Sequence, residues 1–337
     1  MIVTPALADA NNGNWQTARR WARMLSPAYR VRIATAWKGG DEALMIALHA
    51  RRSAPSIALW HALRPGAPLA VVLTGTDLYR DIAGDAGAQA SLQSADRLIV
   101  LNQLGAAALP AALRPKARVL LQSCDARQPM PKTGVHLRAI MVGHLRDEKA
   151  PQTYFDAARR LAHRADIRLD HVGAALDPAL GAAATALARA GPGYRWLGAM
   201  PRGAARRRIQ AAHVLVHPSR IEGGANVVIE AVRSGTPVLA SRIDGNVGLL
   251  GDDYGGYFPL DDAAGLAALL QRARDEPALL AGLQAQCAVR AGLFDPKREG
   301  AALIAFVAEL RAPINEGVPV FGAAREGGVR SRYEEPT

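Results

Sequence analysis

The fold follows from one stretch of sequence, His217-Pro-Ser-Arg-Ile-Glu-Gly-Gly-Ala-Asn-Val-Val-Ile-Glu-Ala-Val-Arg-Ser-Gly-Thr-Pro-Val-Leu-Ala-Ser241. An apolar run just before it, Val214 to Val216, predicts a buried strand. Asn226 to Arg233 predicts a helix, and Pro237 to Ala240 predicts the next strand. A strand, a turn, a helix and a strand in this order form the building block of a parallel sheet that is covered by helices.

Two carboxylates make this stretch unusual. Glu222 lies in the predicted turn and Glu230 in the predicted helix, with seven residues between them. Gly223 and Gly224 allow the backbone to approach a ligand closely, and Asn226 can cap a helix N-terminus that favours an anion. Carboxylates accept hydrogen bonds from vicinal hydroxyls, and exposed amides face sugar or phosphate oxygens. The stretch therefore suits a sugar that is linked to a nucleotide diphosphate.

The length and composition predict a globular protein of two domains. The chain has 337 residues, half of them apolar, which is enough for two cores of ordinary size. No apolar run approaches the roughly 20 residues of a membrane span, and the first residues lack the pattern of a signal peptide. Cys124 and Cys287 are far apart, without metal-like spacing. We therefore expect a cytoplasmic protein with no stable membrane insertion.

The net charge of +11 allows three kinds of partner: nucleic acid, an anionic membrane surface or an anionic substrate. A bias of the composition towards alanine and arginine also explains it, since lysine occurs at five positions only. Arg202 and Arg206 to Arg208 form the densest cluster, which we expect to be the solvated face of a helix. Aromatic residues do not alternate with the basic ones, so nucleic-acid binding is not predicted.

Six apolar runs predict the strands of a first sheet. They are Met1 to Thr4, Val31 to Thr35, Leu44 to Leu48, Leu69 to Leu73, Leu98 to Leu101 and Val119 to Leu121. A helix is expected from Trp15 to Leu25, and the proline-rich segment Gln128 to Thr133 predicts a linker. We therefore expect two domains, 1–132 and 133–311, and a loosely docked or disordered tail at 312–337.

The second half shows the same alternation of strands and helices. Two further strands are predicted at Ala139 to Val142 and Arg168 to Val172. Helices are expected at Pro151 to His163, Asp177 to Ala190, Asp261 to Arg274, Pro277 to Arg290 and Pro296 to Leu310. Asp244 to Gly248 reads as a glycine-rich turn that borders the site or merely joins two elements. The pattern predicts an α/β protein with two Rossmann-like parallel sheets that face each other across a cleft.

Polar residues follow several strands of the first half directly. These segments are Asn11-Asn12-Gly13-Asn14, His49-Ala50-Arg51-Arg52-Ser53 and Thr74-Gly75-Thr76-Asp77. Ligands of open α/β sheets bind at the carboxyl ends of strands, so each segment is a candidate binding loop. Each also has an ordinary interpretation: Asn14 as a helix cap, His49 as a structural histidine, and Asp77 as a residue that holds its own loop.

These features resemble the retaining glycosyltransferases of the GT-B fold that use nucleotide-sugar donors and carry two glutamates separated by seven residues. The resemblance covers residues 1–311 and rests on Glu222 and Glu230, on Ser234-Gly-Thr-Pro-Val238, and on the turn Gly143-His-Leu-Arg-Asp-Glu-Lys149. It implies that Glu230 binds the ribose hydroxyls and Glu222 the donor sugar. Gly223, Gly224, Ala225 and Asn226 would face the sugar and the diphosphate. The last helix could cross back onto the first domain.

The resemblance also implies how the donor diphosphate is neutralised. Lys149 matches the lysine of the family's turn, His144 stands where that turn usually has arginine, and Arg146 is the candidate for the missing charge. No Asp-x-Asp motif occurs, so we expect a metal-independent enzyme without a cofactor. The candidate catalytic residues are Glu222, Lys149, Arg146 and His144. His217 is expected to pack near the site rather than to transfer a proton.

A narrower resemblance concerns the acceptor. Leu48 to Ser53, Leu73 to Asp81 and Val142 to Lys149 are similar to the selenosugar synthases of selenoneine biosynthesis. Those enzymes join selenophosphate to a UDP-sugar, with UDP-N-acetylglucosamine as the expected donor. The implied acceptor is a small anion. Candidate substrate-binding residues of the first half are then Gly13, Asn14, His49, Arg51, Arg52, Thr74, Gly75, Thr76 and Asp77, with Arg80 nearby.

Two other functions remain open from the sequence. One is an ordinary glycosyltransferase with a sugar, a lipid or a small metabolite as acceptor. The other is a protein that binds a nucleotide-sugar or an anion without catalysis, which the complete set of donor-site residues argues against.

Overall fold

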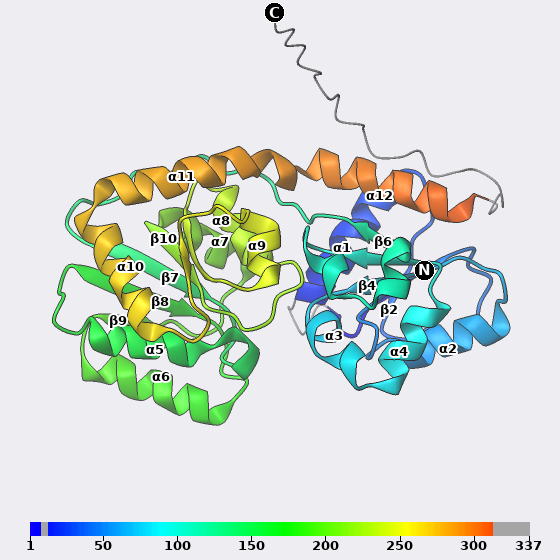
Figure 1. Ribbon diagram of the computed structural model, residues 1–337, viewed down its shortest axis with the longest axis horizontal. Coiled ribbons are helices and arrows are strands. Elements are labelled where there is room, and N and C mark those ends of the chain that lie inside the picture. Colours follow the sequence, from blue (N-terminus) through cyan, green and yellow to red (C-terminus); the bar gives the residue numbers. More distant parts are fainter. Residues whose placement is uncertain (8–12, 313–337) are drawn as a thin grey trace, which may run out of the picture.

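The computed structural model describes residues 1–7 and 13–312 and places two α/β halves beside each other (Figure 1). Asn11, Asn12 and the predicted tail from residue 313 onward lie outside the described residues. The predicted α/β class with two parallel sheets is confirmed.

The first sheet has six parallel strands, as predicted, and their order is β2-β1-β3-β4-β5-β6. The sixth strand begins and ends two residues earlier than predicted. The strands are β1 (Ile2–Val3), β2 (Ile33–Ala34), β3 (Met45–Leu48), β4 (Leu69–Leu73), β5 (Arg97–Val100) and β6 (Ala117–Val119). The α-helices of this half are α1 (Gly13–Leu25), α2 (Ala54–Leu63), α3 (Thr76–Tyr79) and α4 (Ala86–Ser94).

The second sheet also has six parallel strands, in the order β12-β11-β10-β7-β8-β9. The strands are β7 (Leu137–Val142), β8 (Ile167–Val172), β9 (Tyr194–Trp196), β10 (Val214–His217), β11 (Val238–Ser241) and β12 (Tyr257–Phe258). The helices are α5 (Pro151–Arg160), α6 (Pro178–Ala190), α7 (Arg202–Ala211), α8 (Asn226–Val232), α9 (Asp244–Leu250), α10 (Ala263–Asp275), α11 (Pro277–Ala291) and α12 (Pro296–Arg311).

The core of the first half has two layers, one on each face of its sheet. Strands that are buried on both faces need consecutive apolar residues, and every residue of β4 is buried. Trp37 and Trp60 pack on one face, and their rings meet edge to face. Trp21 of α1 packs on the other face together with Phe306 of α12.

Helix α12 joins the two halves. It follows α11 along the top of the molecule and comes to lie over α1 of the first half (Figure 1). Its residues Leu303 and Phe306 belong to the core beneath the first sheet. The end of the chain as described therefore contributes to the packing of its beginning. The domain limits 1–132 and 133–311 stay a prediction.

The predicted turn at Asp244 to Gly248 is wrong, because these residues begin helix α9. The two glycines serve close packing instead of chain reversal. A Cβ atom on Gly245 would lie 2.1 Å from the carbonyl oxygen of Glu222, and one on Gly248 would lie 2.3 Å from Oδ1 of Asn102. Strands β9 and β12 were not predicted, because they are only three and two residues long. Helix α5 ends at Arg160 rather than near His163.

Within the described part of the chain, no helix combines the length and the apolar character that a membrane span requires.

Candidate active site

Glu222 is the buried centre of the loop between β10 and α8. Its Oε1 contacts Nζ of Lys149 and lies 3.1 Å from Nε2 of His217. Burial alone would raise the pKa of Glu222, but the charge of Lys149 and the neighbouring His217 outweigh it and hold the pKa well below its usual value. Glu222 is therefore ionised at neutral pH. It can accept hydrogen bonds from hydroxyls or stabilise positive charge, but it has no proton to donate.

The turn after β7 carries three of the predicted catalytic residues, of which Lys149 contacts this carboxylate. Lys149 ends a short 3₁₀ helix, Asp147–Lys149. Nδ1 of His144 accepts a hydrogen bond from the amide of Ala174 at 3.0 Å, which leaves the ring proton on Nε2 when the ring is neutral. Burial, helped by Arg146 and Lys149, lowers the pKa of His144. Neutral His144 can thus donate one hydrogen bond, whereas an arginine at this position would donate several and carry a charge.

Arg146 of the same turn is held loosely. Its side chain is about half exposed, and its Nε lies 4.0 Å from Oε2 of Glu148. That Nε is buried and has no hydrogen-bond partner among the residues described. The guanidinium is therefore available for an anion in this part of the site.

Glu230 is buried in α8, and Arg202 of α7 donates a hydrogen bond from Nε to its Oε1 at 2.8 Å. Arg206 lies 4.0 Å from the same oxygen. The prediction that the arginine cluster is a solvated face is therefore wrong for these two residues. Positions four apart share one side of a helix, and this side of α7 packs against α8. Arg207 and Arg208 are exposed, as expected.

Asn226 does not cap α8 as predicted. Ala225 occupies the cap position, and Asn226 is the first helical residue. The Oδ1 atom of Asn226 accepts a hydrogen bond at 3.3 Å from Nη1 of Arg20 in the first half. The side chain thus serves a contact between the halves.

The loops after β3 and β4 are built around Asp77. This side chain is fully buried and accepts hydrogen bonds from the amides of Ala50, Thr74 and Gly75 at 2.8 to 2.9 Å. Of its two interpretations, the hydrogen bonds describe the residue that holds its own loop. Its assignment to substrate binding stays a prediction.

His49 is buried beside this loop and has a left-handed backbone, with φ of 72°. Its Nε2 lies 3.0 Å from Oγ1 of Thr76. Burial lowers the pKa of His49, and the carboxylates of Asp77 and Asp81 offset this only in part. The amide of Arg52 donates to Nδ1 of His49 at 3.4 Å, which leaves the proton of the neutral ring on Nε2 to be donated to the hydroxyl of Thr76.

Arg51, Arg52 and Arg80 of the first half are more exposed. Nε of Arg51 lies 3.1 Å from Oδ2 of Asp81, and Arg52 is exposed. Arg80 donates from Nη1 to Oε1 of Glu148 at 3.1 Å, which links the first half to the turn after β7.

The two halves meet where glycines permit it. A Cβ atom on Gly75 would lie 2.8 Å from the amide nitrogen of Gly223, and one on Gly224 would lie 2.7 Å from Cβ of Leu101. Nδ2 of Asn102, just after β5, donates to the carbonyl oxygen of Gly223 at 2.8 Å. The structure thus brings the predicted loops after β4 and β10 into contact. Asn102 was missed, although its place at a strand's carboxyl end was a signal for it.

The remaining predicted residues of the first half start helix α1. Gly13 is exposed and Asn14 is half-buried. The Cβ position of Gly13 lies 3.8 Å from Nδ2 of Asn226. This end of α1 therefore lies beside the loop that carries Glu222.

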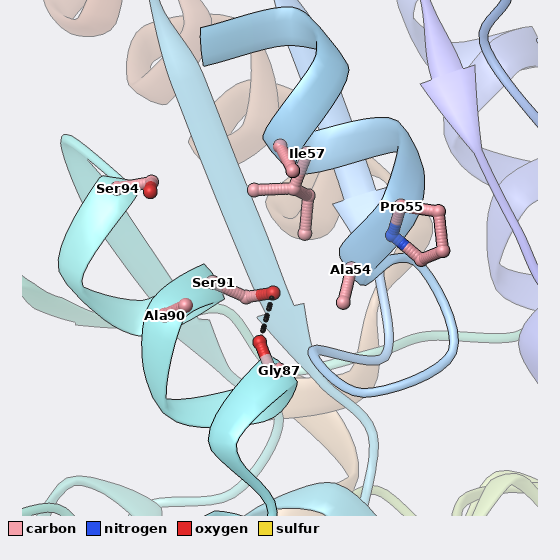
Figure 2. Close-up of a pocket in the computed structure, with 8 residues that line it drawn as sticks. Ala54, Pro55, Ile57, Gly87, Ala90, Ser91 and Ser94 are labelled. Atoms are coloured by element: carbon pink, nitrogen blue, oxygen red, sulfur yellow. Dashed lines mark hydrogen bonds between the residues drawn. The ribbon is translucent and has the colours of Figure 1, made fainter. Parts of the chain in front are cut away.

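Within residues 1–7 and 13–312, no three His, Cys, Asp or Glu side chains form a group that could hold a metal ion; metal independence stays a prediction. A shallow hollow of about 270 Å³ lies elsewhere, between α2 and α4 (Figure 2). Its lining is small and uncharged, with Ser91 bonded back to the carbonyl oxygen of Gly87. It contains none of the predicted site residues.

Comparison with known proteins agrees with this architecture. Residues 136–275 match the model of the family described as glycosyl transferases group 1. Among solved structures, similar folds include a mutant of S. aureus TarM in complex with Fondaparinux, alpha-GlcNAc-glycerol and UDP, with a TM-score of 0.63, 12% identity, and coverage of 80% of this chain and 55% of that one. The chain thus spans about half the length of TarM.

Two further structures match a larger share of their own length. Sucrose-phosphate synthase from Thermosynechococcus elongatus has a TM-score of 0.65 and 19% identity, over 80% of this chain and 73% of that one. Anabaena HepE in complex with UDP-glucose has a TM-score of 0.65 and 16% identity, over 79% of each chain. No curated protein sequence matches the chain. The chain therefore has the GT-B fold, and its residues 136–275 are similar to the glycosyl transferases group 1 family.

Proposed function

We propose that the protein transfers a sugar from a UDP-sugar to a small anionic acceptor. One observation carries this proposal: the buried, ionised Glu222 lies in contact with Lys149, in a loop packed directly on the loop after β4. A carboxylate and a cation at a strand end of one domain, facing a polar loop of the other, suit a donor whose sugar lies between the two. The TarM and HepE structures contain UDP or UDP-glucose, which supports the choice of nucleotide.

The donor would be held by the second half. Glu230 would bind the ribose hydroxyls, Glu222 would accept hydrogen bonds from the sugar, and the backbone from 223 to 226 would face the diphosphate. As the bond between the anomeric carbon and the diphosphate breaks, negative charge builds up on the leaving group. Lys149 and Arg146 would stabilise that charge, and Nε2 of His144 would add a hydrogen bond. We propose that no metal ion takes part.

The acceptor that we propose is selenophosphate, with UDP-N-acetylglucosamine as the donor. Selenium would form a bond to the anomeric carbon as the bond to UDP breaks, and water would then cleave the phosphorus–selenium bond and release phosphate. Support comes from the sequence of the loops after β3 and β4 and from their hydroxyl and basic side chains, including Thr76, Arg51 and Arg80. An ordinary acceptor, such as a sugar or a lipid, is the alternative outcome of the test.

Incubation with single UDP-sugars, with and without selenophosphate, tests the proposal by mass spectrometry and by the release of UDP. We expect UDP and a product with the selenium isotope pattern only when selenophosphate is present, with or without EDTA. Rapid transfer to another acceptor would defeat the choice of selenophosphate. Failure to bind any UDP-sugar would defeat the function as a whole.

A further inference from the structure

One face of helix α1 contacts helices α7 and α8 of the second half. Gly13, Gln16 and Arg20 follow each other at spacings of three and four residues, which places them on one side of the helix. Oε1 of Gln16 accepts from Nη1 of Arg202 at 3.3 Å, and Nη1 of Arg20 donates to Oδ1 of Asn226 at 3.3 Å. Arg20 therefore reaches the residue at which α8 begins.

Glu299 of α12 holds Arg20 in this position. The carboxylate is almost fully buried and accepts from Nε of Arg20 at 2.9 and 3.1 Å. Nε1 of Trp21 donates to it at 2.6 Å, and the hydroxyl of Ser123 donates to its other oxygen. With its Nε fixed in this way, the planar guanidinium can point its two Nη groups in only one direction.

One end of the Arg20 guanidinium is left over. Its Nη2 is buried and has no hydrogen-bond partner in the described part of the chain. A buried donor on a charged group is costly when it stays unpaired. Two other cations of the site are already paired, because Lys149 contacts Glu222 and Arg202 binds Glu230. Arg20 is thus a fixed cation at the start of α8 with a donor still to be used.

We propose that Arg20 is a further ligand for the donor's phosphate groups and that Glu299 is the residue that positions it. The inference rests on the proposed function, in which the diphosphate of the nucleotide-sugar lies beside Asn226 at the start of α8. The guanidinium fork matches phosphate oxygens in geometry, while Glu299 reduces its net charge and fixes its direction. A donor bound in this way contacts both halves, and α12 acquires a role in the site through its return to α1.

Binding of UDP and of uridine to four proteins tests the assignment. They are the unaltered chain, Arg20→Gln, Glu299→Gln and the exposed neighbour Arg19→Gln as a matched change of charge. Calorimetry should show UDP binding about 10- to 100-fold weaker for Arg20→Gln, as expected for a lost charge-assisted hydrogen bond. Uridine, measured by competition, and Arg19→Gln should show changes of less than about twofold. Equal weakening of UDP and uridine by Arg20→Gln would overturn the assignment.

The double variant Arg20→Gln/Glu299→Gln tests whether Glu299 positions Arg20 or only stabilises the fold. If Glu299 acts through Arg20, the double variant binds UDP no more weakly than Arg20→Gln alone. Additive losses, with uridine affected as well, would show a structural role only and overturn the positioning. Failure of the unaltered chain to bind UDP would instead refute the proposed function, so the two failures are distinct.

Discussion

The second half of the molecule, which we propose binds the donor (the donor half), and the first half, which we propose binds the acceptor (the acceptor half), use their charges in different ways. In the donor half, Glu222 and Glu230 are buried and each is paired with a cation from a different element, Lys149 and Arg202. In the acceptor half the buried carboxylate of Asp77 holds its own loop through backbone amides. Arg51, Arg52 and Arg80 of that half stay largely exposed to solvent.

This difference indicates where the site is already organised. Breaking a buried pair leaves a charge without compensation in a medium that solvates it poorly. An exposed arginine contributes little to stability, and salt screens its attraction for an anion. We therefore expect changes of Glu222 and Glu230 to cost stability and activity together, and changes of the exposed arginines that follow β3 to affect acceptor binding alone.

The largest effect is expected for Glu222→Gln, which leaves Lys149 without its buried partner. Removing one member of a buried pair typically costs about 3–5 kcal/mol. Urea unfolding should show a loss of this order, and UDP release from the UDP-sugar should fall to near background. Unchanged stability would mean that the two halves do not differ as described.

The double variant Glu222→Gln/Lys149→Met separates the two consequences. With both charges gone, nothing is left unpaired, and replacement of a buried pair by uncharged groups is often close to neutral. Stability should therefore recover while activity stays lost. Recovery of activity would show that the pair only supports the fold.

If Glu230 binds the ribose as proposed, Glu230→Gln should weaken UDP binding by about 2–4 kcal/mol, because the ribose hydroxyls then lose a charged acceptor in a buried place. Titration calorimetry with UDP measures this directly. Acceptor KM should stay within about twofold. An equal rise of acceptor KM would contradict a division of the site into donor and acceptor halves.

Much of this comparison could be predicted from the sequence. The strands follow from apolar runs, and the candidate binding loops follow from the rule that ligands bind at the carboxyl ends of strands. The two glutamates were recognised from the glycines between them. These features could be predicted because each depends on residues that are close together in the sequence.

The pairing between distant elements could not be predicted. Arg202 appeared as one of several arginines on a helix, and only the packing of α7 on α8 shows that it faces Glu230. Gly245 and Gly248 suggested a turn, because close packing on Glu222 and Asn102 is invisible without the fold. Glu299 lies 279 positions from Arg20, and no local signal joins them.

We expect the protein to become less stable towards unfolding at acidic pH because of His171, a buried residue of strand β8. Burial lowers the pKa of His171 from 6.5 to about 4. A group that binds protons less readily when folded stabilises the protein above its unfolded pKa and loses this contribution as pH falls. The loss should be about 1 kcal/mol by pH 5.5 and about 3 kcal/mol near pH 4.

Urea midpoints between pH 7 and pH 4 measure this dependence. Since other groups titrate in the same range, the decisive comparison is with His171→Gln, which should flatten the profile between pH 6.5 and pH 4. The exposed His163→Gln should leave the profile unchanged. Identical slopes for both variants would assign the acid sensitivity to other residues, such as His49 of the acceptor half.

Arg51→Ala should affect the acceptor half alone. Loss of one charge-assisted contact to an anion would raise the KM for selenophosphate about tenfold. UDP binding should stay nearly intact, and the exposed Arg30→Ala serves as a matched control of charge. Arg52→Ala should act in the same direction. Equal losses of donor and acceptor binding would refute the assignment of these arginines to the acceptor.

The smallest effect is expected for Thr76→Val, which keeps the shape of the side chain and removes the hydroxyl that faces Nε2 of His49. Water can reach the half-buried Thr76, so the cost should be only about 1 kcal/mol. If the hydroxyl contacts the acceptor, acceptor KM rises about fivefold, and Thr76→Ser, which retains it, restores the value. UDP affinity should not change, although the neighbouring Gly75 packs on Gly223. A fall in UDP affinity as large as the rise in acceptor KM would show that the loop after β4 also binds the donor. This loop would then belong to the donor site, and the first half could not be assigned to the acceptor alone.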